Sequence, residues 1–298
     1  MHAGEFAGVH AAIRLWREIN PADLRGEIVI IPVMSTRAFF ARSMQLSPVD
    51  AHEMHFQPVG HPEATYSTFH IDAVFNLLRD LDVHVDMHGG EYVQSLDPWI
   101  AFPEPQNDRQ KQAAWRLAGS FPVPYLDPRT PDNQDAFSTL SQGLPFALLN
   151  ADVVNVWTEI GQNGLQDPTA IEMQFQGLVN ALVRFDMIDR QPLPVPQQSV
   201  VGPRKWSFEA THSGYWQPAI AAGQRVCQGQ HLGSIEDLAG NHLESFTAPD
   251  DALVQYVWTS PAINVGRAPH GYPWHRGLMR LMEIRSDAHE DPRLQFAR

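Results

Sequence analysis

Two short segments carry side chains that could bind one metal ion. The first, His2-Ala-Gly-Glu5, places an imidazole and a carboxylate three residues apart on a loop before a predicted helix. The second, Asp86-Met-His88-Gly-Gly-Glu91, follows a predicted buried strand, and open α/β sheets place their binding crevices at the carboxyl ends of strands. Together, His2, Glu5 and His88 form a set of two histidines and one carboxylate. Catalytic zinc has three such protein ligands and keeps a fourth position for water.

Each segment also has a structural explanation when it is taken alone. His2 and Glu5 are then two surface residues near a chain end, and His88 is a histidine that packs at a strand end. Other histidines of this region favour that explanation, because His70 lies on a predicted helix and His84 on a predicted strand. The metal hypothesis therefore depends on the combination of the segments.

A third segment, Trp157-Thr-Glu159-Ile-Gly161, ends a predicted strand with an acidic residue. The neighbours of Glu159 are predicted to be buried, so its carboxylate is poorly placed for solvent. Metal-assisted hydrolysis needs a carboxylate that accepts a proton from water and passes it to the leaving nitrogen. Glu159 is the candidate general base, and an ion pair with an arginine at the sheet edge is the structural alternative.

The elements that would position these residues alternate between helix and strand. Apolar spacing predicts helices over 9–19, 67–81, 109–118 and 170–185, and strands over 27–33, 83–87 and 153–160. The β-branched run 27–33 is typical of a strand buried on both faces of a parallel sheet. The stretches 35–66 and 98–145 are predicted to be largely irregular, and long irregular insertions are commonly functional. This alternation predicts an α/β sheet with helices on both faces.

A proline-rich linker at 191–196 marks the predicted domain boundary. Residues 1–190 are predicted to form the catalytic α/β domain, and residues 197–298 a small all-β domain. Short predicted strands punctuated by turn residues follow the linker, at 205–210, 223–226, 231–235 and 252–258.

The motifs, in this order, resemble the succinylglutamate desuccinylase/aspartoacylase family of zinc-carboxypeptidase-like deacylases. The first segment looks like the family's His-Gly-Asp/Asn-Glu, and the second like its Asp-Leu-His. Glu159-Ile-Gly resembles the family's Glu-x-Gly, and Ser47-Pro-Val-Asp50 its Ser-Pro-Ile-Asp. The glycine-punctuated run 223–235 is similar to a hairpin of the family's C-terminal β domain. The resemblance covers nearly the whole chain.

This resemblance implies a mixed sheet sandwiched by helices, followed by a small β domain. It implies a zinc-dependent hydrolase that removes the acyl group from a small N-acylated amino acid or related acyl amide. One zinc ion per chain would be held by His2, Glu5 and His88, and Glu159 would be the base. Asp86 would orient one of the metal ligands without binding the metal itself.

The sequence departs from the family pattern at two places. The family's Asn-Leu-Asn-Arg, which holds a substrate carboxylate, is replaced by Glu53-Met-His55-Phe56. Phenylalanine cannot form the paired bonds of an arginine, so His55 and Arg42 become the candidate substrate-binding residues. The family also has strands before its first ligand. We therefore expect that a segment lies upstream or that the sheet edge near His2 is unfinished.

Composition excludes several classes of protein. Hydrophobic residues make up 43% of the 298 residues and charged residues 18%, which is typical of a globular chain. The net charge of −13 argues against nucleic acid and anionic membranes as partners. The single cysteine, Cys227, cannot form an internal disulfide, and the sequence has no apparent signal or membrane-spanning run, so we expect a cytoplasmic protein. The oligomeric state is not indicated.

Three alternative functions remain open or are discounted. The lost carboxylate clamp also suits a non-catalytic relative that binds zinc or another ligand. A metallocarboxypeptidase acting on peptides would share the metal site, but it needs an arginine that binds the terminal carboxylate. A biotinyl or lipoyl carrier domain needs a presented lysine, and the two lysines, Lys111 and Lys205, lie outside the glycine-rich hairpin.

Overall fold

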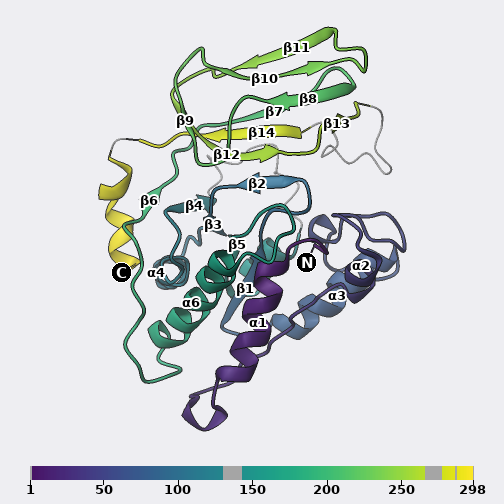
Figure 1. Ribbon diagram of the computed structural model, residues 1–298. Helices are drawn as coiled ribbons and strands as arrows, with labels where there is room; N and C mark the ends of the chain where they lie inside the picture. Colours follow the sequence, from purple (N-terminus) through teal and green to yellow (C-terminus); the bar gives the residue numbers. More distant parts are fainter. Residues whose placement is uncertain (1, 130–142, 266–276, 286, 298) are drawn as a thin grey trace.

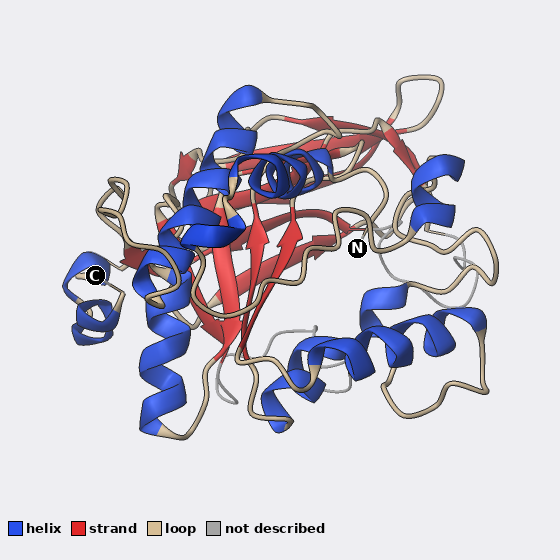
Figure 2. Ribbon diagram, turned by 90° about the horizontal axis from the view of Figure 1, so that it is seen from below, coloured by secondary structure: helices blue, strands red, loops and turns tan. Residues whose placement is uncertain are grey.

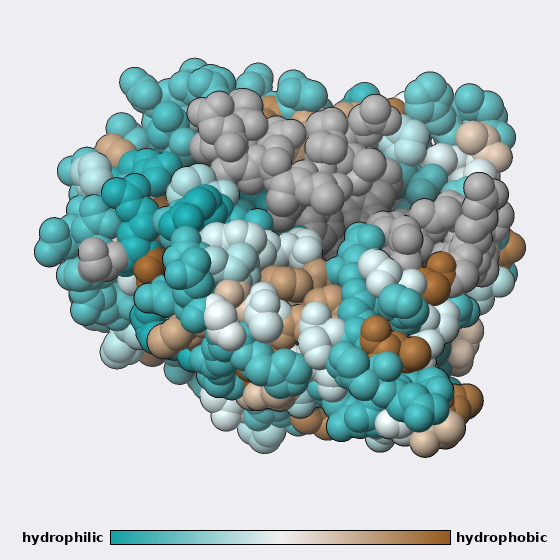
Figure 3. All heavy atoms as spheres, turned by 90° about the horizontal axis from the view of Figure 1, so that it is seen from above, coloured by the Kyte–Doolittle hydropathy of each residue, from teal (hydrophilic) through white to brown (hydrophobic). Residues whose placement is uncertain are grey.

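The computed structural model describes residues 2–129, 143–265, 277–285 and 287–297. A helix-rich half lies below a stack of β-strands, and the N-terminus lies between them (Figure 1). Within these residues, no helix has both the length and the apolar character needed to cross a membrane. Seen from above, the surface is mostly hydrophilic, with hydrophobic residues in small scattered groups (Figure 3).

The main sheet of the described residues has five strands in the order β1-β5-β3-β4-β6. They are β1 (Val83–His88), β3 (Trp99–Pro103), β4 (Tyr125–Arg129), β5 (Val154–Glu159) and β6 (Ser199–Val200). Parallel pairs join β1 to β5, β3 to β4 and β4 to β6, whereas β3 and β5 are antiparallel. The predicted fold class, a mixed sheet between helices with a β-rich C-terminal part, is confirmed.

One face of the main sheet is covered by α1 (Phe6–Glu18), α4 (Asp108–Ala118) and α6 (Pro168–Arg184) (Figures 1 and 2). Alternate strand residues, Ile100, Phe102, Val154 and Val156, pack with these helices in a shared core. The period of two along a strand sends the intervening residues to the opposite face. Trp157 and Glu159 therefore share that opposite face.

The opposite face is partly covered by α5 (Leu144–Asn150), whose Pro145 carbonyl accepts a hydrogen bond of 2.9 Å from Asn155 of β5. Helix α3 (Tyr66–Leu78) packs beside α5 through Ile71 and Leu148. Shorter helical segments complete this half, namely η1 (Pro21–Asp23), α2 (Thr36–Ala41) and η2 (Met54–Phe56). The helices predicted from apolar spacing correspond to α1, α3, α4 and α6.

Antiparallel strands form two further sheets, and all of these strands except β2 follow the linker. One has the order β11-β10-β8-β13 and the other β2-β12-β14-β7, with β9 paired to β12. Their bounds are β2 (Gln94–Leu96), β7 (Lys205–Glu209), β8 (Gly214–Pro218), β9 (Arg225–Val226), β10 (His231–Glu236), β11 (His242–Thr247), β12 (Ala252–Trp258), β13 (Ala262–Ile263) and β14 (Gly277–Met282). Trp216, Leu232, Ile235 and Leu278 are central to their common core.

Segments cross the predicted boundary between the two domains. Strand β2 comes from the first half of the chain but pairs with β12, whereas β6 follows the linker and pairs with β4. The C-terminal segments η7 (Ala288–Glu290) and η8 (Pro292–Phe296) return to the first half, where Leu294 joins the core of α4. The division into 1–190 and 197–298 stays a prediction.

The strand predicted over 27–33 is wrong. These residues form no strand, and Val29 and Ile31 are 39% and 37% exposed. A β-branched run becomes a strand only when a neighbour satisfies its backbone groups, and none of the described strands pairs with it.

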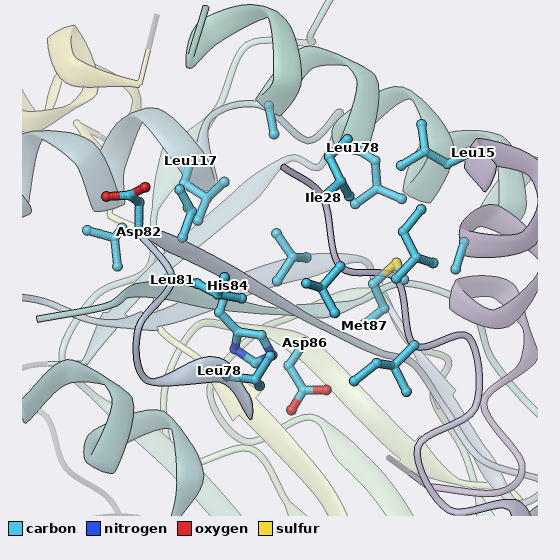
Figure 4. A pocket seen from close by; sticks show the side chains of 18 of the residues that line it. Leu15, Ile28, Leu78, Leu81, Asp82, His84, Asp86, Met87, Leu117 and Leu178 are labelled. Carbon is cyan, nitrogen blue, oxygen red and sulfur yellow. The ribbon is translucent and has the colours of Figure 1, made fainter. Parts of the chain in front are cut away.

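A cavity of about 1090 Å³ lies between this run and β1. Ile28, Leu178 and Met87 line it (Figure 4). Strand β1 pairs only with β5 among the described strands, so its other edge faces this cavity. His2 and Glu5 line the cavity as well.

The prediction of an irregular stretch over 98–145 is also wrong in part, because β3 and β4 occupy it. Prolines caused the error, since Pro128 lies inside β4 and proline is rare within a sheet. Strand β6 pairs only with Tyr125 and Leu126, so Pro128 lies beyond the paired part of that edge. Residues 130–142 of the stretch lie outside the described residues.

A buried ion-pair group joins the main sheet to the C-terminal strands. The Asp127 carboxylate lies 2.8 Å from Lys205 Nζ of β7 and 2.9 Å from an Arg129 guanidinium nitrogen. All three side chains are buried. Because a buried charge is tolerated only when it is paired, this carboxylate fixes how the C-terminal strands sit on the sheet face that carries Glu159.

We predict that Asp127→Asn lowers the free energy of unfolding by about 3–5 kcal/mol, because it removes a buried negative charge that faces two buried cations. Asp250→Asn is the matched control, since it removes an exposed partner of Arg204 and should have little effect. Urea denaturation of both variants measures the difference. Equal, small effects would show that the buried group does not hold the two parts together.

Candidate metal centre

The loop that leads into α1 brings His2 and Glu5 together. Glu5 occupies the N-cap position of α1, but its side chain makes no capping bond. Its carboxylate instead lies 2.8 Å from His2 Nδ1, through Oε1, and 3.1 Å from His88 Nδ1, through Oε2. Glu5 is 8% exposed, so one buried carboxylate lies between two imidazoles.

His88 reaches the same place from the end of β1. It is paired in register with Glu159 of β5, and its ring centroid lies 4.9 Å from that of His2. The chain then passes close to neighbouring backbone, because a Cβ on Gly89 would lie 2.6 Å from the Ile160 carbonyl. Glycine is needed there, which accounts for the glycine that follows the histidine.

The structure therefore brings the three predicted ligands together. One nitrogen or oxygen atom from each of His2, Glu5 and His88 lies within 4.8 Å of the others. A second such set, which shares His88, contains His55 and Asp86. The ligand role of these residues stays a prediction.

Both imidazoles have a second carboxylate behind them. Asp86 Oδ2 lies 3.0 Å from His88 Nε2, in keeping with the predicted orienting position. Glu53 Oε1 lies 2.9 Å from His2 Nε2. Sequence reasoning missed Glu53, although it lies in the segment that departs from the family motif.

The donor set fits a divalent cation. Glu5 Oε2, His88 Nε2 and Asp86 Oδ2 are buried polar atoms that lack hydrogen-bond geometry to any described group. Buried polar atoms normally have a partner. Two imidazoles and a carboxylate are the ligand types that catalytic zinc uses, so these residues could hold such an ion.

The pKa shifts of the two histidines also support a cation site. Burial lowers the pKa of His88, but the charges of Asp86 and Glu5 outweigh burial and raise it to about 9. The pKa of His2 is also raised well above its usual value, because Glu5 and Glu53 outweigh burial. Without a metal, these shifts favour the doubly protonated, cationic form of each imidazole, and metal binding would release protons.

Glu159 projects from the end of β5 on the face that carries Asp86 and His88. Burial raises the pKa of its carboxyl group to about 8, with a further contribution from the charge of Glu5 and in spite of the opposing charge of His88. A carboxyl group with a pKa near neutrality can both accept and release a proton. This position suits the predicted base, whose role stays a prediction.

Glu91 is a second buried acid that sequence reasoning did not single out. It is fully buried, and burial raises its pKa to about 8, against the lowering effect of His2. Its backbone N–H donates to the side-chain oxygen of Gln94. A hydrogen bond from the Gly4 backbone N–H lowers the pKa of the Glu91 carboxyl group, but burial outweighs it. The motif contained Glu91, but only the structure shows that it is buried beside the ligand loop.

The two predicted substrate-binding residues have different surroundings. His55 is 5% exposed and lies in the cluster, where Nδ1 is 3.6 Å from Asp86 Oδ2. Arg42 is exposed at the end of α2, where it closes the helix with a φ of 53°. The described contacts of the cluster do not include Arg42, and both roles stay predictions.

No family model matches the chain. A curated relative, the N-alpha-acetyl-L-2,4-diaminobutyric acid deacetylase of Halomonas elongata, is 24% identical over 273 residues, covering 89% of this chain and 77% of that protein. The product-bound structure of the ectoine utilization protein EutE (DoeB) from Ruegeria pomeroyi matches with a TM-score of 0.81 and 20% identity, covering 94% of this chain and 82% of the other.

A succinylglutamate desuccinylase/aspartoacylase from Rhodobacter sphaeroides matches with a TM-score of 0.78 and 19% identity, covering 95% of this chain and 83% of the other. The chain has the fold of the succinylglutamate desuccinylase/aspartoacylase family. The resemblance that the sequence motifs indicate is thereby confirmed.

We predict that the metal-free protein loses stability as the pH rises from about 6.5 to 9. The raised pKa of His88 gives stability that is complete below the unfolded value of about 6.5 and is lost as the pH passes about 9. The raised pKa of Glu159 has the same sign, because the folded state keeps a proton that the unfolded state releases above about pH 4.5.

Urea denaturation in the presence of a chelator, at several pH values, measures this slope. Glu159→Gln removes one of the contributions of this sign, so its slope should be shallower than that of the unmodified protein. Stability that stays level or increases over this range would contradict the assigned pKa directions.

Proposed function

We propose that the protein is a zinc-dependent hydrolase that cleaves the amide bond of a small N-acylated amino acid or a related acyl amide. The observation that carries this proposal is the convergence of His2, Glu5 and His88 beside Glu159. The name of the Halomonas elongata relative, a deacetylase of an N-acetylated amino acid, supports the same reaction class.

His2, Glu5 and His88 would hold the ion. A zinc ion at this place would supply Lewis acidity to the acyl carbonyl and to a water molecule. Glu5 contributes the one negative charge among the three ligands, and its burial keeps this charge free of competition from bulk water.

Glu159 would move the proton. Its carboxylate takes a proton from the attacking water and delivers it to the amine nitrogen that leaves. Its position at the end of β5, in register with His88, supports this role. The cations of His2 and His88 lower its pKa against burial, so a divalent ion nearby would favour its ionised, basic form.

The proposal specifies only the chemical class of the substrate. The carboxylate clamp that the family motif provides is absent here, so a carboxylate next to the reacting amide is not required of the substrate. We keep His55 and Arg42 as proposed substrate contacts. A small-molecule acyl amide is the proposed partner.

Two measurements test the proposal directly. Elemental analysis of the purified protein should find one zinc per chain, removed by a chelator. A panel of N-acyl amino acids and acyl amides should then reveal turnover by the zinc-loaded protein. Zinc binding without turnover of any member would favour the non-catalytic relative, and release of C-terminal residues from peptides would favour a carboxypeptidase.

We predict that Glu159→Gln lowers kcat by about 10²–10⁴ and leaves the zinc content unchanged, because it removes the proton acceptor but keeps shape and volume. Glu91→Gln is the matched control, since it removes another buried carboxyl group with a pKa of about 8. Its effect on kcat should be much smaller.

Full activity of the Glu159→Gln variant would remove Glu159 from the reaction. Loss of zinc together with activity would make it a ligand instead. A larger loss in the Glu91→Gln variant would transfer the role of base to Glu91.

A further inference from the structure

Glu159 has one directly paired neighbour on each side in the main sheet. Strand β5 lies between β1 and β3, and Glu159 pairs in register with His88 of β1 and with Trp99 of β3. Directly paired residues share a face of the sheet, and in an antiparallel pair their Cβ atoms are about 4.5–5.5 Å apart. The candidate base therefore has a candidate metal ligand on one side and a tryptophan on the other.

Trp99 is held in a fixed place. At this residue β3 pairs on both sides, with Glu159 of β5 and with Tyr125 of β4. The side chain is 6% exposed and belongs to a hydrophobic core with Trp157, against which Tyr256 of β12 packs. The indole is therefore part of the contact between the main sheet and the C-terminal strands, beside Glu159.

The indole N–H of Trp99 is available for a further hydrogen bond. Trp99 Nε1 is buried and has no hydrogen-bond partner among the described residues. Two other buried tryptophans do have one, since Trp115 Nε1 donates to Glu104 at 2.8 Å and Trp216 Nε1 donates to the Trp258 carbonyl at 2.9 Å. Buried donors normally have a partner, so an open donor beside the candidate base indicates a ligand.

We propose that Trp99 is a specificity-determining residue that donates its indole N–H to an oxygen atom in the amine half of the substrate. This inference rests on the proposed function and names the chemistry that it favours in the leaving amine. An indole N–H can donate a hydrogen bond but cannot accept one. The matching group is therefore a carboxylate or a carbonyl oxygen, and not an ammonium group.

The order of the three paired residues decides which half of the substrate meets Trp99. The acyl carbonyl belongs on the side of His88, where the candidate ligands converge. The amine nitrogen receives its proton from Glu159 and must come within hydrogen-bond distance of that carboxyl group. The substituents of this nitrogen then extend away from His88, which is toward β3 and Trp99.

The test uses three matched substrates and two matched variants. The substrates are the best N-acyl amino acid of the panel, its carboxamide, and the N-acyl amine in which a methyl group replaces the carboxylate. Trp99→Phe removes the N–H and keeps an aromatic ring. Trp258→Phe is the control, because Trp258 Nε1 is also buried without a partner among the described residues but lies in the core of the C-terminal strands.

We expect Trp99→Phe to raise KM about 10–100-fold for the carboxylate and about 2–10-fold for the carboxamide, because hydrogen bonds to charged groups are the stronger ones. KM for the methyl compound and kcat for all three should change little. Trp258→Phe should leave the order of the three substrates unchanged. Both variants lose packing volume, so urea denaturation should show similar losses of stability, and such losses would not depend on the substrate.

A second measurement does not depend on turnover. In the isotope-labelled zinc-loaded protein, the indole N–H signal of Trp99 is identified among those of the eight tryptophans by its absence in Trp99→Phe. This signal should shift when the N-acyl amino acid is titrated, and much less with the methyl compound.

Equal KM changes for the three substrates, or no change for the carboxylate, would overturn the inference, and so would turnover without a shift of the Trp99 signal. A shifted Trp99 signal without hydrolysis of any member of the panel would contradict the proposed reaction alone, since it would still show Trp99 as a binding residue.

Discussion

The candidate site depends on one buried carboxylate that lies between two imidazoles. Glu5 contacts Nδ1 of both His2 and His88, whose rings are 4.9 Å apart. Two protonated imidazoles at this separation repel each other, and Glu5 offsets that repulsion together with Glu53 and Asp86. A divalent cation that displaces one proton from each imidazole leaves the charge of the cluster unchanged. The surroundings that stabilise the protonated, metal-free state are therefore also suited to the metal-bound state.

The main sheet positions two of the candidate site residues. His88 and Glu159 end neighbouring parallel strands in register, so the candidate ligand and the candidate base are fixed by backbone hydrogen bonds rather than by loops. The His2 and Glu5 loop is different, because its position depends on α1 and on side-chain contacts. Backbone hydrogen bonds therefore hold His88 and Glu159, whereas side-chain contacts hold His2. The position of His2 is the less firmly fixed of the two.

Much of the fold could be predicted from sequence because apolar periodicity is a local signal. It located α1, α3, α4 and α6 and the strands β1 and β5, and these two strands carry Asp86, His88 and Glu159. It failed where the outcome depends on partners. The run 27–33 has strand composition but pairs with none of the described strands, and Pro128 lies within β4, where it is paired with Phe102 of β3.

The candidate site shows the same division between local and distant information. The type and order of His2, Glu5, His88 and Glu159 predicted that these residues belong together. Glu53 lies 51 residues from His2, and nothing in the local pattern connects the two. In the sequence Glu53 is a departure from the substrate-binding motif of the family, whereas in the structure its carboxylate contacts a candidate metal ligand. Glu53 Oε1 already accepts from His2 and from the His55 backbone, so that oxygen has little capacity left for a substrate group.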